Sequence, residues 1–195
     1  MLYRLFKWLF SLTVRGYFRS IHIEGFENIP ISDPVVFVAN HNSAFMDPIL
    51  LAVHIKRPLY FLARGESFKS KIISTFFKYL NMIPIYRPET SPDLVYKNKQ
   101  VFRKCFEHLA EGKTILIFPE GVSKTERNLQ KLKTGTARIV LGAEDKNRFK
   151  LNIKIVPIGI NYSDPHHFRS QVFINFGKAL DVFQYADLFL SLIHI

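Results

Sequence analysis

A histidine and an aspartate lie six positions apart in the segment VVFVANHNSAFMDPIL, residues 35–50. The apolar run before them predicts a buried strand, and Pro48 with the apolar residues after it predicts a helix that begins nearby. A neutral imidazole with a carboxylate on its other nitrogen has its tautomer fixed and its protonated form stabilised, so it can take a proton from a hydroxyl. The pair alone is a weak motif, but α/β sheets bind ligands where strands end. His41 and Asp47 are therefore candidates for general-base catalysis.

The sequence offers no recognisable protein nucleophile to complete a catalytic triad. It contains no G-x-S-x-G segment, and its single cysteine, Cys105, belongs to the apolar side of a predicted helix. The nucleophile would then be a hydroxyl of the substrate. A lone cysteine also excludes an internal disulfide framework and a cysteine-rich metal site, and it fits a reducing compartment.

Two other segments end predicted strands in residues suited to a ligand site. ILIFPEG ends in Glu120 and Gly121, a turn where backbone donors and a carboxylate can face the same crevice as His41. IPIYR ends in Arg87, and an arginine there can clamp a phosphate with two hydrogen bonds. The alternative interpretations are an ordinary strand-to-loop turn and an exposed surface charge.

Strands and helices alternate along the chain that must position these residues. Apolar runs predict strands at residues 35–39, 59–63, 83–86, 114–118, 153–160 and 171–177, and helical spacing predicts helices at 67–80, 92–112 and 134–144. This order predicts an α/β fold, a single domain with a mixed, largely parallel central sheet covered by helices, over residues 21–189.

Residues 1–20 predict an amphipathic helix that lies in a membrane interface. Their polar residues recur at steps of three and four, namely Arg4, Lys7, Ser11, Arg15 and Arg19. Aromatic and aliphatic residues fill the rest, and no apolar run approaches the roughly 18 residues that a membrane span needs. The alternative is a helix that packs on the core of the protein.

The charge of the chain points to an anionic partner. Twenty-seven Lys and Arg against sixteen Asp and Glu give a net charge of +11 over 195 residues, which suits lipid headgroups, nucleic acid or small phosphorylated molecules. Nucleic acid is disfavoured because no helix-turn-helix, zinc module or RNP-like motif appears and the basic residues are scattered. We therefore expect a peripheral protein on the cytoplasmic face of an anionic membrane, either an enzyme or a non-catalytic basic membrane-binding protein.

Four blocks in order give the sequence a family resemblance. Asn40-His41 with Asp47-Pro48, then IPIYR at 83–87, FPEG at 118–121 and IVPIG at 155–159 resemble the blocks of the PlsC-type glycerolipid acyltransferases. The likeness extends from about Gly25 to Gly177. It implies transfer of a fatty acyl group from acyl-coenzyme A or acyl carrier protein, as co-substrate and without a cofactor, to glycerol 3-phosphate or 1-acylglycerol 3-phosphate in phospholipid biosynthesis.

The resemblance also implies roles for individual residues. His41 would be the base that activates the acceptor hydroxyl, and Asp47 would orient it. Arg87, Glu120 and Gly121 would be associated with the glycerol phosphate. The fourth block would be associated with the acyl side of the site.

One departure concerns the first block. The commonest family pattern places four residues between histidine and aspartate, whereas five separate His41 from Asp47. HNSAFMDP resembles the H-x-N-x-F-x-D-P variant of the fungal-type glycerol-3-phosphate and dihydroxyacetone-phosphate acyltransferases. Ser43 stands where the asparagine of that variant falls, and with Arg64 it is a further candidate for substrate binding. The alternative is that the extra residue disables the site.

A metal site is conceivable from Asp164, His166 and His167. Adjacent histidines without a third well-spaced ligand are more often loop residues, so we expect no metal.

The last six residues, LSLIHI at 190–195, match the translation of a transposase adapter end used in DNA sequencing libraries. We therefore expect the native sequence to stop at or near Phe189 and the chain to be truncated there. His194 would then have no function.

Overall fold

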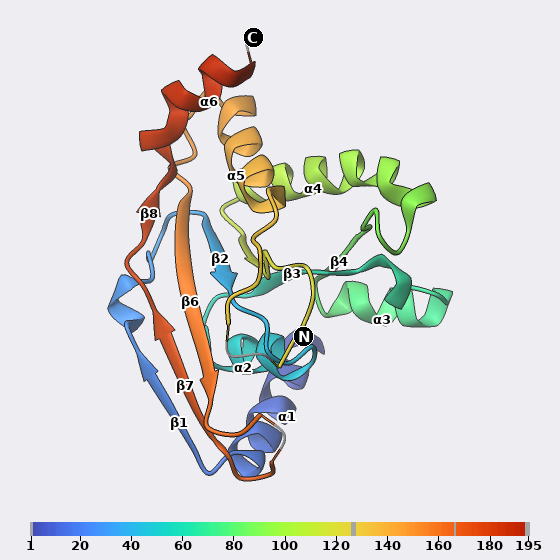
Figure 1. The fold of residues 1–195 in the computed structure, drawn as a ribbon, viewed down its shortest axis with the longest axis vertical. Helices are drawn as coiled ribbons and strands as arrows, with labels where there is room; N and C mark the ends of the chain where they lie inside the picture. The colour runs from blue at the N-terminus through green and yellow to red at the C-terminus, as the bar shows by residue number, and fades with distance from the viewer. Residues whose placement is uncertain (1, 126–127, 166, 194–195) are drawn as a thin grey trace.

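One mixed sheet runs through the protein, whose computed structural model describes residues 2–125, 128–165 and 167–193. The strand order is β1-β7-β6-β2-β5-β3-β4, with β8 paired to β6 (Figure 1). The strands are β1 Ser20–Glu24, β2 Val35–Ala39, β3 Leu59–Arg64, β4 Met82–Ile85, β5 Thr114–Ile117, β6 Lys154–Tyr162, β7 Gln171–Phe176 and β8 Leu180–Asp181. Only β6 with β7 and β6 with β8 run antiparallel among the described pairs. The prediction of a mixed, largely parallel α/β sheet is therefore confirmed.

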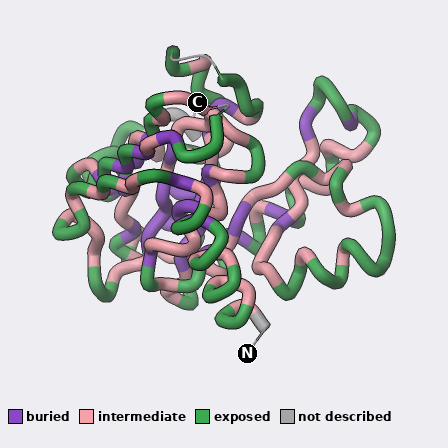
Figure 2. Tube along the Cα trace, turned by 90° about the horizontal axis from the view of Figure 1, so that it is seen from below, coloured by how far each residue is buried: buried purple, intermediate pink, exposed green. Residues whose placement is uncertain are grey.

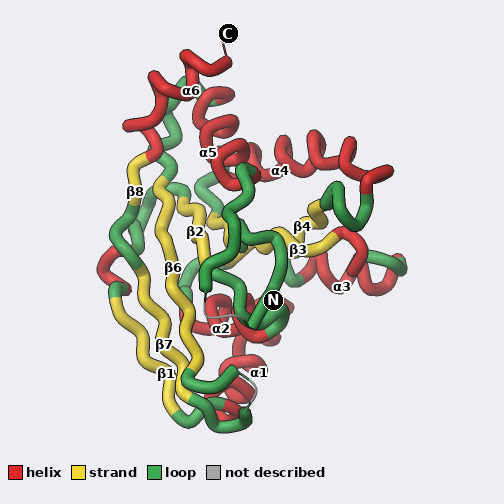
Figure 3. Tube along the Cα trace, in the orientation of Figure 1, coloured by secondary structure: helices red, strands yellow, loops and turns green. Residues whose placement is uncertain are grey.

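Helices cover both faces of the sheet (Figure 3). They are α1 Leu2–Tyr17, α2 Met46–His54, α3 Lys71–Tyr79, α4 Asn98–Ala110, α5 Gly135–Lys146 and α6 Ala186–Ile193. One core cluster joins α1 and α2 to the sheet, and a second joins α4 and α5 to its other face. Phe37 belongs to the first cluster and its neighbour Val36 to the second, as expected because successive side chains of a strand point to opposite faces. Figure 2 shows the buried residues gathered at the centre of the fold.

On β6 and β7, the face of the sheet that points away from α1 and α2 is less covered than the rest of the sheet. Val172, Ile174 and Phe176 of β7 are buried, whereas Phe173 between them is 47% exposed. This alternation is that of a strand with one face on the core and one face open. The open face becomes one wall of the cleft described below.

Several element boundaries differ from the predictions. The helix expected from residue 67 begins at Lys71, because the hydroxyl of Ser70 caps it by accepting a hydrogen bond from the backbone N–H of Ile73 at 3.2 Å. The helix expected from Pro92 starts as a 3-10 turn, Pro92–Lys97, and becomes α-helical only at Asn98. Strand β1 was not predicted; its pairing with β7 stabilises a segment in which polar and apolar residues alternate.

The ends of the chain bear on two further predictions. No helix among the described residues combines the length and apolarity that crossing a membrane requires. Helix α6 runs through Phe189, where the adapter-encoded tail was expected to follow, and residues 194–195 lie outside the described part of the chain. The tail therefore stays a prediction.

Candidate active site

The loop that carries the candidate base is anchored to β6. The side chain of Asn40, directly after β2, donates a hydrogen bond to the carbonyl of Ile160 at 2.9 Å and accepts one from its N–H at 2.7 Å. The amide of Asn42 donates to the same carbonyl at 3.0 Å. These side chains extend the β2–β6 pairing beyond the last residue of β2, so His41 lies between two fixed positions.

His41 and Asp47 are in direct contact. Nδ1 of His41 lies 2.9 Å from Oδ2 of Asp47, and the imidazole stacks on the ring of Phe118 with centroids 4.0 Å apart and planes at 19°. Because an ionised carboxylate only accepts hydrogen bonds, Nδ1 carries the proton in this contact, and Nε2 is the nitrogen that can accept a proton from a substrate. The extra residue in the loop therefore does not keep the two side chains apart.

Asp47 is fully buried and its two oxygens accept three hydrogen bonds. Besides the imidazole, Oδ2 accepts from the backbone N–H of Ser43 at 2.8 Å. The hydroxyl of Tyr162 donates to Oδ1 at 2.5 Å. These three donors compensate the cost of burying a polar group away from water.

Arg87 is buried at the end of β4 and is only partly paired. Its Nη1 donates to the carbonyl of Gly121 at 2.6 Å, and the side chain is 9% exposed. Nε and Nη2 are buried and have no hydrogen-bond partner among the described residues. Unpaired buried donors of a guanidinium are costly, so this pair of N–H groups is suited to an anionic ligand.

The turn behind Arg87 is held by a carboxylate. Oε1 of Glu66 accepts hydrogen bonds from the hydroxyls of Ser91 and Thr90, each at 2.5 Å. These hydrogen bonds, with a smaller contribution from the charge of Arg87, lower the pKa of Glu66 to about 2. Glu66 is therefore ionised at neutral pH and fixes the residues that follow Arg87.

Glu120 and Gly121 join the candidate base to the candidate phosphate ligand. Glu120 is 4% exposed, and its Oε1 accepts a hydrogen bond from the backbone N–H of His41 at 3.1 Å. Gly121 has φ of 68°, a left-handed conformation that glycine adopts readily, and from this turn its carbonyl accepts the hydrogen bond of Arg87. The structure thus brings His41, Asp47, Arg87, Glu120 and Gly121 into one connected network.

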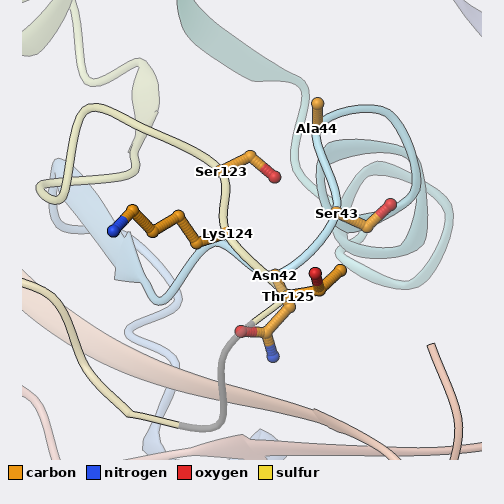
Figure 4. Close-up of a pocket in the computed structure, with 6 residues that line it drawn as sticks. All are labelled: Asn42, Ser43, Ala44, Ser123, Lys124 and Thr125. Atoms are coloured by element: carbon orange, nitrogen blue, oxygen red, sulfur yellow. The ribbon is translucent and has the colours of Figure 1, made fainter.

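Ser43 and Arg64 lie differently. Ser43 lines a cavity of about 470 Å³ between its own loop and the segment at 123–125, and its N–H contacts Asp47 (Figure 4). Arg64 ends β3 and is exposed, and no hydrogen bond among the described residues ties it to the network. As a candidate for substrate binding, Arg64 could therefore act only as an exposed positive charge.

A larger cleft of about 850 Å³ begins at the same loop. It runs from Asn40 and Glu120 along the open side of β6 and β7, under the segment that follows Pro119. Its lining includes the exposed side chains of Leu129, Leu132 and Phe173. The cleft therefore has a polar end at Asn40, Asn42 and Glu120, the first two being the chain neighbours of His41, and an apolar wall.

No group of three or more His, Cys, Asp or Glu suited to a metal ion occurs within residues 2–125, 128–165 and 167–193. Nδ1 of His167 pairs with Asp164 at 2.7 Å, on exposed side chains. His166 of the conceivable metal site lies outside the described residues.

Tyr162 and Glu66 are the site residues that the sequence analysis missed. Tyr162 is the last residue of β6, 115 positions from Asp47, and it lies outside the four family blocks. One available signal was its polar tip two residues after the strand predicted at 153–160, where ligands of α/β sheets bind.

Comparisons with known proteins agree with this geometry. The family model described as Acyltransferase matches residues 20–161. Glycerol-3-phosphate O-acyltransferase 1 of Saccharomyces cerevisiae is 26% identical over 93% of this chain and 35% of its own length. A 1-acyl-sn-glycerol-3-phosphate acyltransferase of Chlamydomonas reinhardtii is 31% identical over 72% of this chain and 38% of its own. The chain thus spans little more than a third of these curated relatives.

A solved structure shares the fold. The crystal structure of the 1-acyl-sn-glycerophosphate acyltransferase PlsC from Thermotoga maritima matches with a TM-score of 0.67 and 21% identity, over 92% of this chain and 68% of that one. The family match covers more than half of the sequence and includes the contact between His41 and Asp47. The chain belongs to the acyltransferase family.

Proposed function

We propose that the protein transfers an acyl group from an acyl thioester to a hydroxyl of glycerol 3-phosphate or 1-acylglycerol 3-phosphate. The observation that carries this proposal is the 2.9 Å contact between His41 and buried Asp47, in one network with Arg87. The named functions of the two curated relatives, both glycerol-phosphate acyltransferases, support the same chemistry.

The proposed reaction needs one base, which takes a proton from the acceptor and later gives it to the leaving group. Nε2 of His41 takes the proton of the acceptor hydroxyl while the oxygen attacks the thioester carbonyl, and the imidazolium is stabilised by Asp47. Collapse of the tetrahedral intermediate breaks the carbon–sulfur bond, and the leaving thiolate takes the proton from His41. General-base catalysis contributes roughly 10² to 10⁴ in rate, so the remainder must come from positioning the substrates and stabilising the oxyanion.

Arg87 is the proposed phosphate ligand. Its unpaired Nε and Nη2 form the edge of the guanidinium fork that matches two phosphate oxygens. A phosphate there would satisfy both buried donors. The net charge of +11 would attract this acceptor and an anionic acyl donor, acyl-coenzyme A or acyl carrier protein, toward the protein. The proposed reaction uses no cofactor.

The cleft along β6 and β7 is the proposed site of the acyl chain. It reaches Pro157, in the block that the resemblance associates with the acyl side, and it presents Leu129, Leu132 and Phe173 to the chain. Burial of methylene groups against such a wall is favourable by about 0.8 kcal/mol each.

We also propose that α1 and α3 dock the enzyme on an anionic membrane. One side of α1 packs on the protein, where Val14 is buried and the ammonium of Lys7 donates to the carbonyl of Ile55. The other side is apolar and open, with Leu5, Trp8, Leu9 and Leu12 between 42% and 58% exposed. The alternative interpretation, packing on the protein, thus holds for one face of the helix, and the proposed membrane contact concerns the other face. Lys7, which was expected in the basic stripe, lies on the face that packs on the protein.

Helix α3 adds a second apolar face beside the first. None of its residues is buried, and Ile72 is 83% exposed. The ring of Phe76 meets that of Phe6 on α1 edge-on at 5.3 Å, which joins the two helices. Exposed basic residues flank both apolar faces, namely Arg4, Arg15, Lys71 and Lys78. An apolar face with basic borders is the pattern of helices that lie in a lipid interface, here proposed on the cytoplasmic side of the membrane.

A non-catalytic membrane-binding protein would have no use for the network around His41. The experiment that separates the two classes measures free thiol released from an acyl-coenzyme A in the presence of lipid vesicles. Glycerol 3-phosphate, dihydroxyacetone phosphate and lysophosphatidate serve as acceptors, and His41→Ala serves as the control. Release that requires both an acceptor and His41 supports the proposal and names the acceptor. No release with any acceptor, from folded protein and also with acyl carrier protein as donor, would overturn it.

A further inference from the structure

Tyr162 completes the hydrogen bonding of Asp47 from the far side of the dyad. Its hydroxyl donates to Oδ1 at 2.5 Å, while Oδ2 is occupied by His41 and the N–H of Ser43. We propose that Tyr162 is a positioning residue that fixes Asp47 and limits how strongly this carboxylate holds the protonated imidazole. The proposal rests on the proposed role of His41 as the base.

The position of Tyr162 suits this role because β6 holds both ends of the reacting loop. Ile160 binds Asn40, next to His41, and Tyr162 two residues later binds Asp47. The loop between His41 and Asp47 is therefore clamped to one strand at each end. Within this loop the N–H of Ser43 and the ring of His41 hold only Oδ2 of Asp47, so the donor to Oδ1 comes from outside the loop.

The surroundings of Tyr162 keep its hydroxyl a donor. Its ring is partly buried and lies 5.9 Å from the ring of Phe18, which follows α1 and is 5% exposed. Burial, with the nearby charge of Asp47, raises the pKa of Tyr162 above its ordinary value. The phenol therefore keeps its proton over the range in which an acyltransferase would work, and it donates to the carboxylate throughout.

Loss of this donor changes the chemistry of the dyad in a definite direction. A carboxylate that donors surround has its negative charge spread over them, so it attracts the imidazolium less strongly. Without the Tyr162 hydroxyl, the charge of Asp47 acts on His41 undiminished and the protonated form of the dyad is favoured. The base is then occupied by a proton up to higher pH.

Other ionisable groups near the dyad are few among the described residues. Glu120 contacts the backbone N–H of His41, and Lys124 donates its backbone N–H to the carbonyl of His41 at 3.1 Å. Tyr17 is a further ionisable group that interacts with Tyr162. Tyr162→Phe leaves all three in place, so a change in pH dependence is assignable to the lost hydroxyl.

The test is the pH profile of kcat/KM for acyl transfer by wild type, Tyr162→Phe and the control Tyr17→Phe. The control removes a tyrosine hydroxyl from the same neighbourhood without touching Asp47. We expect the acid limb of Tyr162→Phe to move upward by about one pH unit and that of Tyr17→Phe to stay. A merely structural role would lower the rate at every pH and leave the limb in place, which would overturn the proposal.

A second measurement does not depend on activity. In protein with isotope-labelled histidine, assigned with His41→Gln, the NMR signal of His41 should titrate at higher pH in Tyr162→Phe than in wild type. In an Asp47→Asn background, Tyr162→Phe should produce no such shift, because Tyr162 acts through Asp47. An unchanged titration in the Tyr162→Phe single variant would refute the positioning role. If His41 titrates as expected but wild type transfers no acyl group, the proposed function fails and the role of Tyr162 survives.

Discussion

Oδ2 of Asp47 accepts a hydrogen bond both from the ring of His41 and from the backbone N–H of Ser43, at 2.9 and 2.8 Å. The N–H of Asp47 in turn donates to the carbonyl of Ser43 at 3.2 Å, which closes a helical turn that leads into α2. Five residues separate His41 from Asp47, one more than the commonest family pattern has, and this turn accommodates the additional residue. The contact between His41 and Asp47 is made despite the extra residue.

Replacement of either member of this pair should abolish most of the activity and leave folding intact. Without the base, His41→Ala should lose about 10²- to 10⁴-fold in kcat, and Asp47→Asn should lose about 10²-fold because the tautomer of His41 is no longer fixed. Release of free thiol from acyl-coenzyme A measures both. Vesicle binding should be unchanged in both variants; a loss of binding together with activity would mean that the substitutions unfold the protein.

Removal of the guanidinium at Arg87 should weaken binding of the phosphate. Arg87→Ala should raise KM for glycerol 3-phosphate about 10- to 100-fold, since charge-assisted hydrogen bonds contribute about 1.5–3 kcal/mol. Arg64→Ala is the matched control, because Arg64 is exposed and outside the network. An equal rise in KM in both variants would indicate general electrostatic attraction and would remove the specific role of Arg87.

The apolar faces of α1 and α3 should both contribute to membrane binding. Trp8→Ser and Ile72→Ser should each lower the partition onto vesicles with anionic lipid by about tenfold, from the lost apolar burial. Ile31→Ser is the control, since Ile31 is 97% exposed but belongs to neither helix. Sedimentation with vesicles measures the three variants. If Ile72→Ser behaves like Ile31→Ser, α3 does not touch the membrane.

The sequence indicated those features that local pattern or family spacing controls. Val35 to Ala39 is a short apolar run that favours a buried strand, and it forms β2. His41 was expected directly after this strand, and it lies there. What could not be predicted depends on pairs distant in the chain. Tyr162 meets Asp47 across 115 positions, and Glu66 meets Ser91 across 25. Such contacts follow from the order of strands in the sheet, which alternation of strands and helices does not determine.

Strand β1 illustrates the same limit in the fold itself. Its residues SIHIE alternate polar and apolar over too short a stretch to distinguish a strand from a loop. Its stability comes from parallel pairing with β7, at the opposite end of the chain. Tertiary pairing outweighed a weak local preference.

The carboxylate of Glu66 should make stability depend on pH in acid. Its pKa in the folded protein, about 2, is below the ordinary value of 4.5, because the hydroxyls of Ser91 and Thr90 donate to the charged form. A depressed folded pKa contributes stability that is fully present above about pH 4.5 and is lost as the pH falls toward 2. Glu66→Gln cannot ionise and should lack this contribution.

Urea unfolding of wild type and Glu66→Gln checks this expectation. The midpoint of wild type should be higher at pH 7, and the difference should narrow as the pH is lowered from 4.5 to 3. Glu89→Gln is the matched control: the pKa of Glu89 is also lowered, chiefly by the hydrogen bond from Lys133, but its side chain is 61% exposed and pairs with an exposed lysine. If the difference in urea midpoint between wild type and Glu66→Gln persists unchanged in acid, the substitution acts by disturbing the packing near Arg87 and not by removing a charge. In that case kcat and KM for glycerol 3-phosphate would change at every pH.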